Sequence, residues 1–454
     1  MAEPRVIVVG GGLAGISAAL RLADGDRAVT LVEGRPRLGG MAFSFRRGEL
    51  SIDNGQHVFL RCCAGYRWLL ERLGVAGDVV LQPHLDIPIL RPDGTSARLR
   101  RAPGVPAPFH LSAALARYTL LRPADRLRAA RGALALRALN PADPKLDAQT
   151  LGAFLRQHGQ NDATIDALWG IIATATLNLS PDEASLALAT KVFRTGLLDR
   201  AAAADVGYAA VPLGQLHSDA ALRALTASGV EVLLGHHVDS VEAGGVVRAR
   251  GRTGERSWHA DAVVLATAHR EAFAAAPALA DTAVATAEQL GAAPIVNVHV
   301  IYDRKVTELP FAAAVGSPVQ WFFDRSDSSG LAQLHPHGQY LAITVSAADS
   351  VIDEPSRALQ ERFVAELARL LPAARNAQVL DAFVSRERRA TFRQAAGSAV
   401  RRPTSRSGLD GVWLAGAWTA TGWPDTMESA VRSGVAAADA VLQVQPDSGW
   451  EFAA

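Results

Sequence analysis

The sequence has little cysteine: among 454 residues only Cys62 and Cys63 occur, and they are neighbours. A disulfide framework needs several separated pairs, and a CxxC zinc or redox site needs two intervening residues, so both are excluded. Neighbouring cysteines rarely close a disulfide without strain, so we expect reduced thiols. The closest groupings of histidines, His236-His237 and His335-Pro336-His337, have no convincing partner ligands, and we predict no metal site.

An excess of charge of one sign is also absent, because 46 Lys and Arg residues stand against 45 Asp and Glu residues. This balance argues against a general nucleic-acid-binding protein, and we predict no nucleic-acid partner. No run of about 18 apolar residues lacks a charge, so no transmembrane helix is predicted. The first residues lack the basic and apolar regions of a signal peptide. We therefore predict a cytoplasmic protein.

What the sequence does contain at its start is a complete β-α-β pattern. Val6–Val9 and Val29–Val32 are short β-branched runs typical of buried parallel strands, and Ile16–Ala23 between them has helical composition. A GxGxxG turn joins the first strand to the helix, where free N–H groups and the positive end of the helix dipole can hold a diphosphate. The pattern predicts dinucleotide binding by Gly10, Gly12, Leu13, Ala14 and Gly15.

Glu33 ends the second of these strands. Dinucleotide-binding proteins place an acid about 20 residues beyond the glycine turn, where it binds the ribose hydroxyls. The carboxylate of Glu33 can accept hydrogen bonds from both hydroxyls, and it would repel a 2′-phosphate. The alternative, a glycine turn without a ligand, explains neither the acid nor its position.

The segment after Glu33 reads Gly34-Arg35-Pro36-Arg37-Leu38-Gly39-Gly40. It resembles the flavin amine oxidase and carotenoid desaturase superfamily, in which an arginine and a Gly-Gly pair follow the ribose-binding acid. The resemblance implies FAD as the cofactor. It also implies that Arg37 neutralises phosphate charge and that Gly39 and Gly40 let the chain pass close to the diphosphate.

A second signature of this superfamily lies near the C-terminus. Val412–Gly416 is typical of a strand, Thr421–Pro424 of a turn, and Met427–Val441 of a helix rich in small residues. In the superfamily this segment closes the FAD site, and a backbone N–H at the helix start faces the flavin pyrimidine. The resemblance places that N–H near Thr426 and Met427.

One position departs from the superfamily pattern. Ala417 stands where an aspartate usually helps to hold the ribitol and phosphates, so we expect FAD to be held by backbone groups and Arg37. The resemblance also implies a strand pair over 230–238 that brings the Val238 backbone to the adenine. It completes the predicted cofactor set with Gly34, Gly55, Gly416 and Pro424.

Three further stretches narrow the resemblance to one branch, the squalene-associated FAD-dependent desaturase family. They are Asp53-Asn54-Gly55-Gln56-His57, Tyr66–Gly74, and Arg386–Phe392 with Arg402-Pro403 downstream. The resemblance covers essentially the whole chain. It implies a hydrophobic triterpenoid substrate: hydroxysqualene would be reduced to squalene by hydride from reduced FAD, after loss of water leaves a carbocation.

Hydroxide is a poor leaving group, so an acid should protonate the departing hydroxyl. His57 and Asp53 are the candidates for catalysis, because the family places their loop near the flavin. The alternatives are a turn-capping aspartate and a structural histidine. The sequence does not indicate which electron donor reduces FAD.

Other functions stay open. A carotenoid desaturase or isomerase would act on a polyene precursor with oxidised FAD and needs a similar apolar tunnel. An amine oxidase is less favoured, because no aromatic pair facing the flavin can be located. A flavin-free lipid-binding chaperone of the Rab dissociation inhibitor type would share the fold without redox chemistry, although Glu33, Arg37 and the Gly39-Gly40 pair argue against it.

These patterns predict an α/β fold with a Rossmann-type (GR2-like) FAD-binding domain, a mixed-sheet substrate domain and a helical insertion. The FAD-binding domain is discontinuous over 1–83, 205–275 and 405–445, the insertion covers 84–204, and the substrate domain covers 276–404. Strands are predicted over 295–302, 319–323 and 340–345, helices over 111–121, 124–139, 148–158, 161–175 and 356–371, and a tail over 445–454.

Arginine is concentrated in one part of the insertion. Nine arginines lie from Arg98 to Arg137 against the single acid Asp125, interleaved with Val, Phe, Leu and Tyr. This composition is typical of a segment on an anionic membrane surface. A substrate of about thirty carbons would itself reside in the bilayer, at about 0.8 kcal/mol per buried CH₂. We therefore predict peripheral contact with the inner face of the membrane; the alternative is a solvated helix pair.

Overall fold

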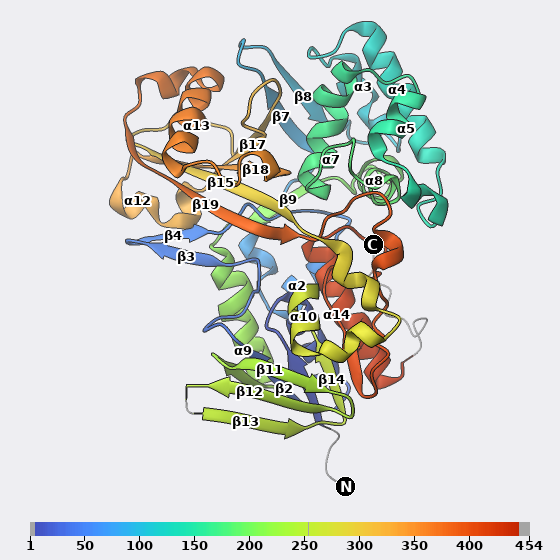
Figure 1. Cartoon of the computed structure of the whole chain (residues 1–454). Coiled ribbons are helices and arrows are strands. Elements are labelled where there is room, and N and C mark those ends of the chain that lie inside the picture. The colour runs from blue at the N-terminus through green and yellow to red at the C-terminus, as the bar shows by residue number, and fades with distance from the viewer. Residues whose placement is uncertain (1–4, 253, 445–454) are drawn as a thin grey trace.

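A five-stranded parallel sheet forms the lower half of the molecule (Figure 1). The computed structural model describes residues 5–252 and 254–444. The strand order is β10 (Glu231–Leu234), β2 (Ala28–Glu33), β1 (Arg5–Val9), β14 (Ala262–Leu265) and β20 (Val412–Leu414). Segments far apart in the sequence thus contribute neighbouring strands, as the Rossmann-type prediction requires, while the exact domain boundaries stay predictions.

Both faces of this sheet are covered, which explains its unbroken apolar strands. Val6 and Val8 face a core that includes α1 (Leu13–Ala23), α9 (Ala220–Ala227) and α14 (Met427–Leu442). Ile7 and Val9 face the opposite core. That core includes residues of the antiparallel sheet β11 (His237–Glu242), β12 (Val246–Gly251) and β13 (Gly254–His259).

The two strands predicted over 230–238 do not pair with each other, so this part of the prediction is wrong. Both strands exist, but β10 pairs with β2 and β11 pairs with β12. The reason is the backbone at Gly235, which has a φ of +68° and lets the chain leave the first sheet. The turn is still fastened to β2, because the His236 N–H donates to the Glu33 carbonyl at 3.0 Å.

The upper half is built on a seven-stranded mixed sheet, as predicted (Figure 1). Its order is β19 (Val379–Thr391), β15 (Ala293–Tyr302), β18 (Gln339–Val345), β17 (Trp321–Asp324), β16 (Phe311–Ala314), β7 (Asp86–Leu90) and β8 (Ser96–Arg100). The helix α13 (Ser356–Leu370) packs on it. The long β19 carries the chain from this sheet down toward the lower half.

The segment 84–204 is not wholly helical. Its first strands, β7 and β8, form a hairpin that joins the substrate sheet, because Ile87, Ile89 and Leu99 are buried there. The helices that follow form a separate layer (Figure 1). They are α3 (Ser112–Ala116), α4 (Pro123–Ala138), α5 (Leu151–Gln157), α6 (Asp162–Thr164), α7 (Gly170–Leu177) and α8 (Leu186–Phe193).

Small elements join the two halves. A hairpin of β3 (Ser44–Arg47) and β4 (Leu50–Asp53) lies beneath the large sheet, and β9 (Val206–Ala209) pairs with both β5 (Val58–Leu60) and β6 (Val79–Leu81). The remaining helices are α2 (Ala64–Arg72), α10 (His269–Ala275), α11 (Ser326–Ser329) and α12 (Leu331–Leu334). The predicted tail over 445–454 lies outside the described residues.

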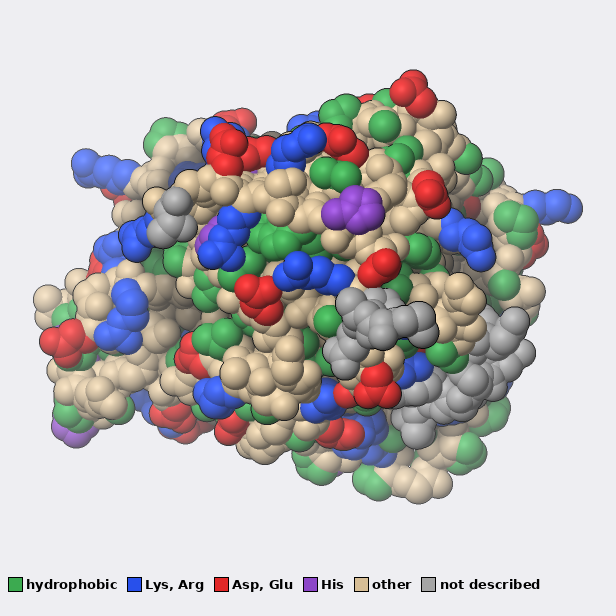
Figure 2. All heavy atoms as spheres, turned by 90° about the horizontal axis from the view of Figure 1, so that it is seen from below, with side chains coloured by type: hydrophobic (Ala, Val, Ile, Leu, Met, Phe, Trp, Pro, Cys, Tyr) green, Lys and Arg blue, Asp and Glu red, His purple; other side chains and the backbone are tan. Residues whose placement is uncertain are grey.

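The surface seen from below mixes acidic and basic side chains without a single-sign field (Figure 2). Over the described ranges, no helix is both long and apolar enough to cross a bilayer. Cys62 and Cys63 are both free thiols, as expected.

Close packing of α1 against α14 depends on Gly434, and this generates a test. A Cβ at this position would overlap the Ala14 carbonyl oxygen and lie 3.0 Å from the Ala18 nitrogen. Alanine normally stabilises a helix interior by up to about 1 kcal/mol over glycine, whereas overpacking costs about 1–3 kcal/mol. We therefore expect Gly434→Ala to lower the thermal melting temperature.

The matched control is Gly77→Ala, where a new Cβ meets nothing within 4 Å. We expect it to leave the melting temperature unchanged or slightly raised. Equal melting temperatures for the two variants would contradict the packing argument.

Candidate functional site

In the turn between β1 and α1, the backbone lies close to neighbouring backbone atoms. Gly10 has a φ of +106°, and a Cβ there would lie 2.6 Å from the Ala266 carbonyl oxygen. Gly12 is the N-cap of α1 and makes no side-chain capping bond. The first N–H groups of α1, from Leu13 and Ala14 onward, are therefore left for an anion, which is the arrangement that binds a diphosphate.

A second glycine loop closes on the first. Gly39 and Gly40 have φ values of +93° and +57°, and a Cβ on Gly40 would lie 2.8 Å from the Gly12 Cα. The Gly39 N–H donates to the Gly11 carbonyl at 2.9 Å, which holds the two loops together. The structure thus brings the two predicted diphosphate-contacting loops to one place.

Arg37 lies at the edge of these loops. Its guanidinium donates to the Gly40 carbonyl at 3.1 Å and stacks 3.6 Å from the centre of the Phe43 ring. Burial, and then the neighbouring charge of Arg35, lower the pKa of Arg37 to about 10. The side chain remains cationic at neutral pH, so it can neutralise phosphate charge as predicted.

Glu33 anchors the first glycine turn and the start of the segment after β2, and it keeps acceptor capacity. One carboxylate oxygen accepts the Gly11 N–H at 2.6 Å and the other accepts the Arg35 N–H at 2.8 Å. Each oxygen can accept a second hydrogen bond, which suits ribose hydroxyls. Gly34 lies against His237, whose Cδ2 would be 3.7 Å from a Cβ on Gly34, so the strand carrying Val238 runs beside this end of the site.

The C-terminal segment is held rigidly where it would close the site. The Gly416 N–H donates to Ser433 Oγ at 2.8 Å, and the Ala417 carbonyl accepts from Arg402 at 3.0 Å. Pro424 is buried, and Thr426 is the N-cap of α14, its hydroxyl accepting the Ser429 N–H at 3.3 Å. Met427 is therefore the first residue of a capped helix, as predicted.

Taken together, these residues fit FAD. Two touching glycine loops, an uncapped helix N-terminus, an arginine and a ribose-binding acid meet at the carboxyl ends of β1 and β2, where parallel sheets bind nucleotides. Ala417 contributes only its carbonyl to this region, so the missing aspartate is not replaced at its own position.

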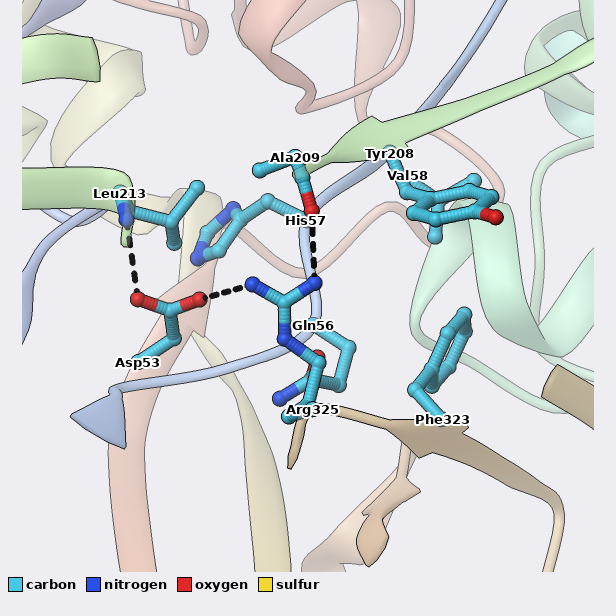
Figure 3. A pocket seen from close by; sticks show the side chains of 9 residues that line it. All are labelled: Asp53, Gln56, His57, Val58, Tyr208, Ala209, Leu213, Phe323 and Arg325. Atoms are coloured by element: carbon cyan, nitrogen blue, oxygen red, sulfur yellow. Dashed lines mark hydrogen bonds and ion pairs between the residues drawn. The ribbon is translucent and has the colours of Figure 1, made fainter. Parts of the chain in front are cut away.

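The predicted catalytic loop begins with a buried ion pair. Asp53, at the end of β4, lies 2.7 Å from the guanidinium of Arg325, and the two side chains are only 6% and 7% exposed. Arg325 also donates to the Ala209 carbonyl at 2.8 Å (Figure 3). The other Asp53 oxygen accepts from Leu213 N–H and Ser44 Oγ. With three partners, this carboxylate ties the end of β4 to Arg325, which precedes α11, and through Arg325 to β9.

His57 lies directly above this pair (Figure 3). Burial, reinforced by the charge of Arg325, lowers the pKa of His57 to about 4. Its Nε2 lies 3.3 Å from Asn54 Oδ1. Because the ring is neutral at pH 7, it suits orienting a substrate better than donating a proton.

The space beside His57 is small, and its lining mixes polar and apolar side chains. It is lined by His57, Asp53, Arg325, Gln56, Val58, Tyr208, Ala209, Leu213 and Phe323. The room for the centre of a water molecule is about 10 Å³, which is enough for one water.

Asn54 fixes the whole loop between the two halves. Its carbonyl accepts from Asn297 on β15 at 2.9 Å, and its amide donates to the Met41 carbonyl at 2.8 Å. A Cβ on Gly55 would meet Asn297 and His57 at 3.6 Å, so this glycine leaves a narrow gap there. The sequence analysis missed Arg325 and Asn297, because both lie far from the loop along the chain and belong to no local motif.

Among the described residues, no cluster of three or more His, Cys, Asp and Glu side chains is arranged to hold a metal ion. The residues described above fit FAD.

The chain matches the family described as flavin containing amine oxidoreductase over residues 13–442, and it belongs to that family. It is thus an FAD-dependent oxidoreductase, and the predicted fold class and cofactor are confirmed. The family membership favours an enzyme over the flavin-free chaperone. The roles of the individual site residues remain predictions.

Particular relatives are similar over nearly the whole chain. The hydroxysqualene dehydroxylase of Rhodopseudomonas palustris is 30% identical over 449 residues, covering 96% of this chain and 98% of that protein. The zeta-carotene desaturase of Arabidopsis thaliana is 25% identical over 509 residues, covering 99% and 86%. The structure of cyclohexylamine oxidase from Brevibacterium oxydans shares the fold, with a TM-score of 0.64, 18% identity, and coverage of 97% and 99%.

The buried Asp53–Arg325 pair can be tested by a double-mutant cycle in urea unfolding. Asp53→Asn leaves Arg325 buried without its counter-charge, so we expect a loss of about 3–5 kcal/mol in the free energy of unfolding. Adding Arg325→Met removes the stranded charge and should recover part of that loss. Strictly additive losses in the double variant would show that the two side chains are not coupled.

Proposed function

We propose that this protein reduces hydroxysqualene to squalene with FAD. The observation that carries the proposal is the match to hydroxysqualene dehydroxylases across 96% of this chain and 98% of the Rhodopseudomonas palustris protein. The desaturase match is lower in identity and covers 86% of its partner.

Different residues would bind the cofactor, orient the substrate and exclude water in this reaction. Glu33, Arg37 and the glycine loops would hold FAD, which when reduced supplies hydride chemistry. The Asp53–Arg325 pair fixes the loop, and the neutral ring of His57 can accept a hydrogen bond from the substrate hydroxyl and orient it. The space beside His57 has room for only one water, so it excludes bulk water, which would otherwise trap a carbocation.

A single anaerobic turnover tests the proposal. The protein with FAD reduced by dithionite is mixed with hydroxysqualene in detergent micelles, the flavin spectrum is followed, and the lipid is extracted. We expect flavin reoxidation with one squalene per flavin. A flavin that stays reduced with hydroxysqualene intact would contradict the proposal and favour the second candidate, desaturation of a carotenoid precursor by the oxidised enzyme.

We also propose that the protein docks on the membrane through α4. Leu127 and Leu134 of α4 are each 55% exposed, and Phe109, which precedes α3, is 64% exposed. Leu127, Arg131 and Leu134 lie three to four positions apart, so they share the solvent face of the helix. An exposed face of leucine and arginine is complementary to an anionic lipid surface.

Only some arginines of the predicted cluster over 98–137 are available to contact lipid. Five of its members, Arg98, Arg100, Arg101, Arg128 and Arg137, pair with acidic side chains, and Arg126 donates to backbone carbonyls. Within the described ranges, Arg117, Arg122 and Arg131 have no ion pair. The proposed contact with lipid therefore rests on these three arginines and the apolar side chains around α4.

Flotation with anionic vesicles tests the docking. Each surface-near arginine contributes about 1 kcal/mol, and the buried leucines add hydrophobic transfer energy, so Leu127→Ser with Leu134→Ser should reduce vesicle binding at least about tenfold. Leu222→Ser on α9, which is 40% exposed in the lower half, is the matched control. Failure of the unaltered protein to float with vesicles would rule out the docking.

A further inference from the structure

Gln56 lines the same small space as His57 (Figure 3). The amide nitrogen of its side chain, Nε2, is buried and has no hydrogen-bond partner among the described residues. A buried donor without a partner destabilises a folded protein, so such groups are rare and call for an explanation. The space that Gln56 lines has about 10 Å³ for the centre of a water-sized group, so the oxygen of a ligand held there can supply the missing acceptor.

His57 offers the opposite kind of group, an acceptor. The side chain of Asn54 fixes this, because its nitrogen donates to the Met41 carbonyl at 2.8 Å and its Oδ1 accepts the Phe43 N–H at 3.1 Å. The same Oδ1 lies 3.3 Å from His57 Nε2, so that nitrogen carries the proton of the neutral ring. Nδ1 then keeps its lone pair, and no described residue makes a hydrogen bond to it.

The other polar groups of the lining are engaged elsewhere. The Asp53 carboxylate and the Arg325 guanidinium bind each other at 2.7 Å, and Arg325 also donates to the Ala209 carbonyl. Figure 3 shows the hydroxyl of Tyr208 directed away from His57. Within the described ranges, the lining therefore offers a ligand one amide donor and one ring-nitrogen acceptor.

This pair of groups is complementary to a single hydroxyl. A hydroxyl donates one hydrogen bond and can accept two. The ring nitrogen of His57 can accept the first bond, and the amide nitrogen of Gln56 can donate one of the others. The small size of the space fits one oxygen atom and excludes a bulkier polar group.

We propose that Gln56 is a specificity-determining residue that selects a substrate with a hydroxyl, an inference that rests on the proposed function. Gln56 Nε2–H donates to the hydroxyl oxygen, and the hydroxyl donates to His57 Nδ1. Hydroxysqualene satisfies both buried groups, whereas a pure hydrocarbon leaves both without a partner. A site built to bind a hydroxyl discriminates strongly against an analogue that lacks it. Squalene, the product, is therefore held less tightly than the substrate.

Competition between the two lipids tests this inference without turnover. The unaltered protein with oxidised FAD is equilibrated with detergent micelles that contain equal amounts of hydroxysqualene and squalene. The protein is captured on an affinity resin and washed with lipid-free detergent, and the bound lipid is extracted and quantified. We expect bound hydroxysqualene to exceed bound squalene at least about tenfold, which corresponds to one or more buried hydrogen bonds.

The variant is Gln56→Met, which keeps the length of the side chain and has no donor. We expect it to lower the ratio of bound hydroxysqualene to bound squalene about tenfold. Its melting temperature should be unchanged or raised, because the variant removes a buried donor without a partner. Gln333→Met, at an exposed position of α12, is the matched control and should leave the ratio unchanged.

Two outcomes overturn the inference. One is an unaltered protein that binds hydroxysqualene no more tightly than squalene, a result that does not depend on how any variant folds. The other is a folded Gln56→Met protein with an unchanged ratio, which would leave Gln56 without a role in recognition.

Failure of the proposed function gives a different result. In that case the protein with reduced FAD forms no squalene, while the ratio of bound lipids still reports whether a hydroxyl is recognised. Squalene formation together with an unchanged ratio in Gln56→Met leaves the reaction standing and removes only the role of Gln56.

Discussion

Close contact between backbones is the constraint on which the rest of this structure depends. Gly12 meets Gly40, and Gly434 meets Ala14, at separations that no side chain would permit. These contacts bring the N-terminal turn, the loop after β2 and the C-terminal helix to one place. Because the diphosphate would be bound mainly by main-chain N–H groups, the geometry of these glycines also sets the geometry of the cofactor.

In the loop that carries Asp53 and His57, the pairing of buried charges decides the structure and the protonation states. Asp53 and Arg325 neutralise each other in the interior, and removing water from a pair in this way is costly unless the geometry is good. Three hydrogen-bonding partners of Asp53, namely Arg325, Ser44 and Leu213, meet that requirement. Burial lowers the pKa of His57, and the charge of Arg325 lowers it further, so the ion pair contributes to both the fold and the protonation state of the loop.

The sequence was most informative where function depends on local backbone. A few consecutive residues define each of three features: the turn at Gly10 to Gly15, the acid at Glu33 and the capped helix that starts at Met427. The structure has all three at the predicted positions. Contacts made by β15 and by the residue before α11 could not be predicted. Asn297 and Arg325 reach the site only through the pairing of a mixed sheet, and no spacing along the chain encodes that pairing. The strands β7 and β8 were not predicted, because a short hairpin before a helical segment shows little alternation of apolar and polar residues.

The interleaved order of the five-stranded sheet has a consequence for biosynthesis. β1 and β2 leave the ribosome first, yet the edge strand β20 and the helix α14 come from residues 412–442. Contacts of such long sequence separation form late and slowly. A nascent chain therefore carries an open sheet edge and an uncovered face of α1 for most of its synthesis, which are the surfaces that aggregate. The predicted cofactor site, which combines the two glycine loops with the start of α14, is therefore complete only after nearly the whole polypeptide has been made.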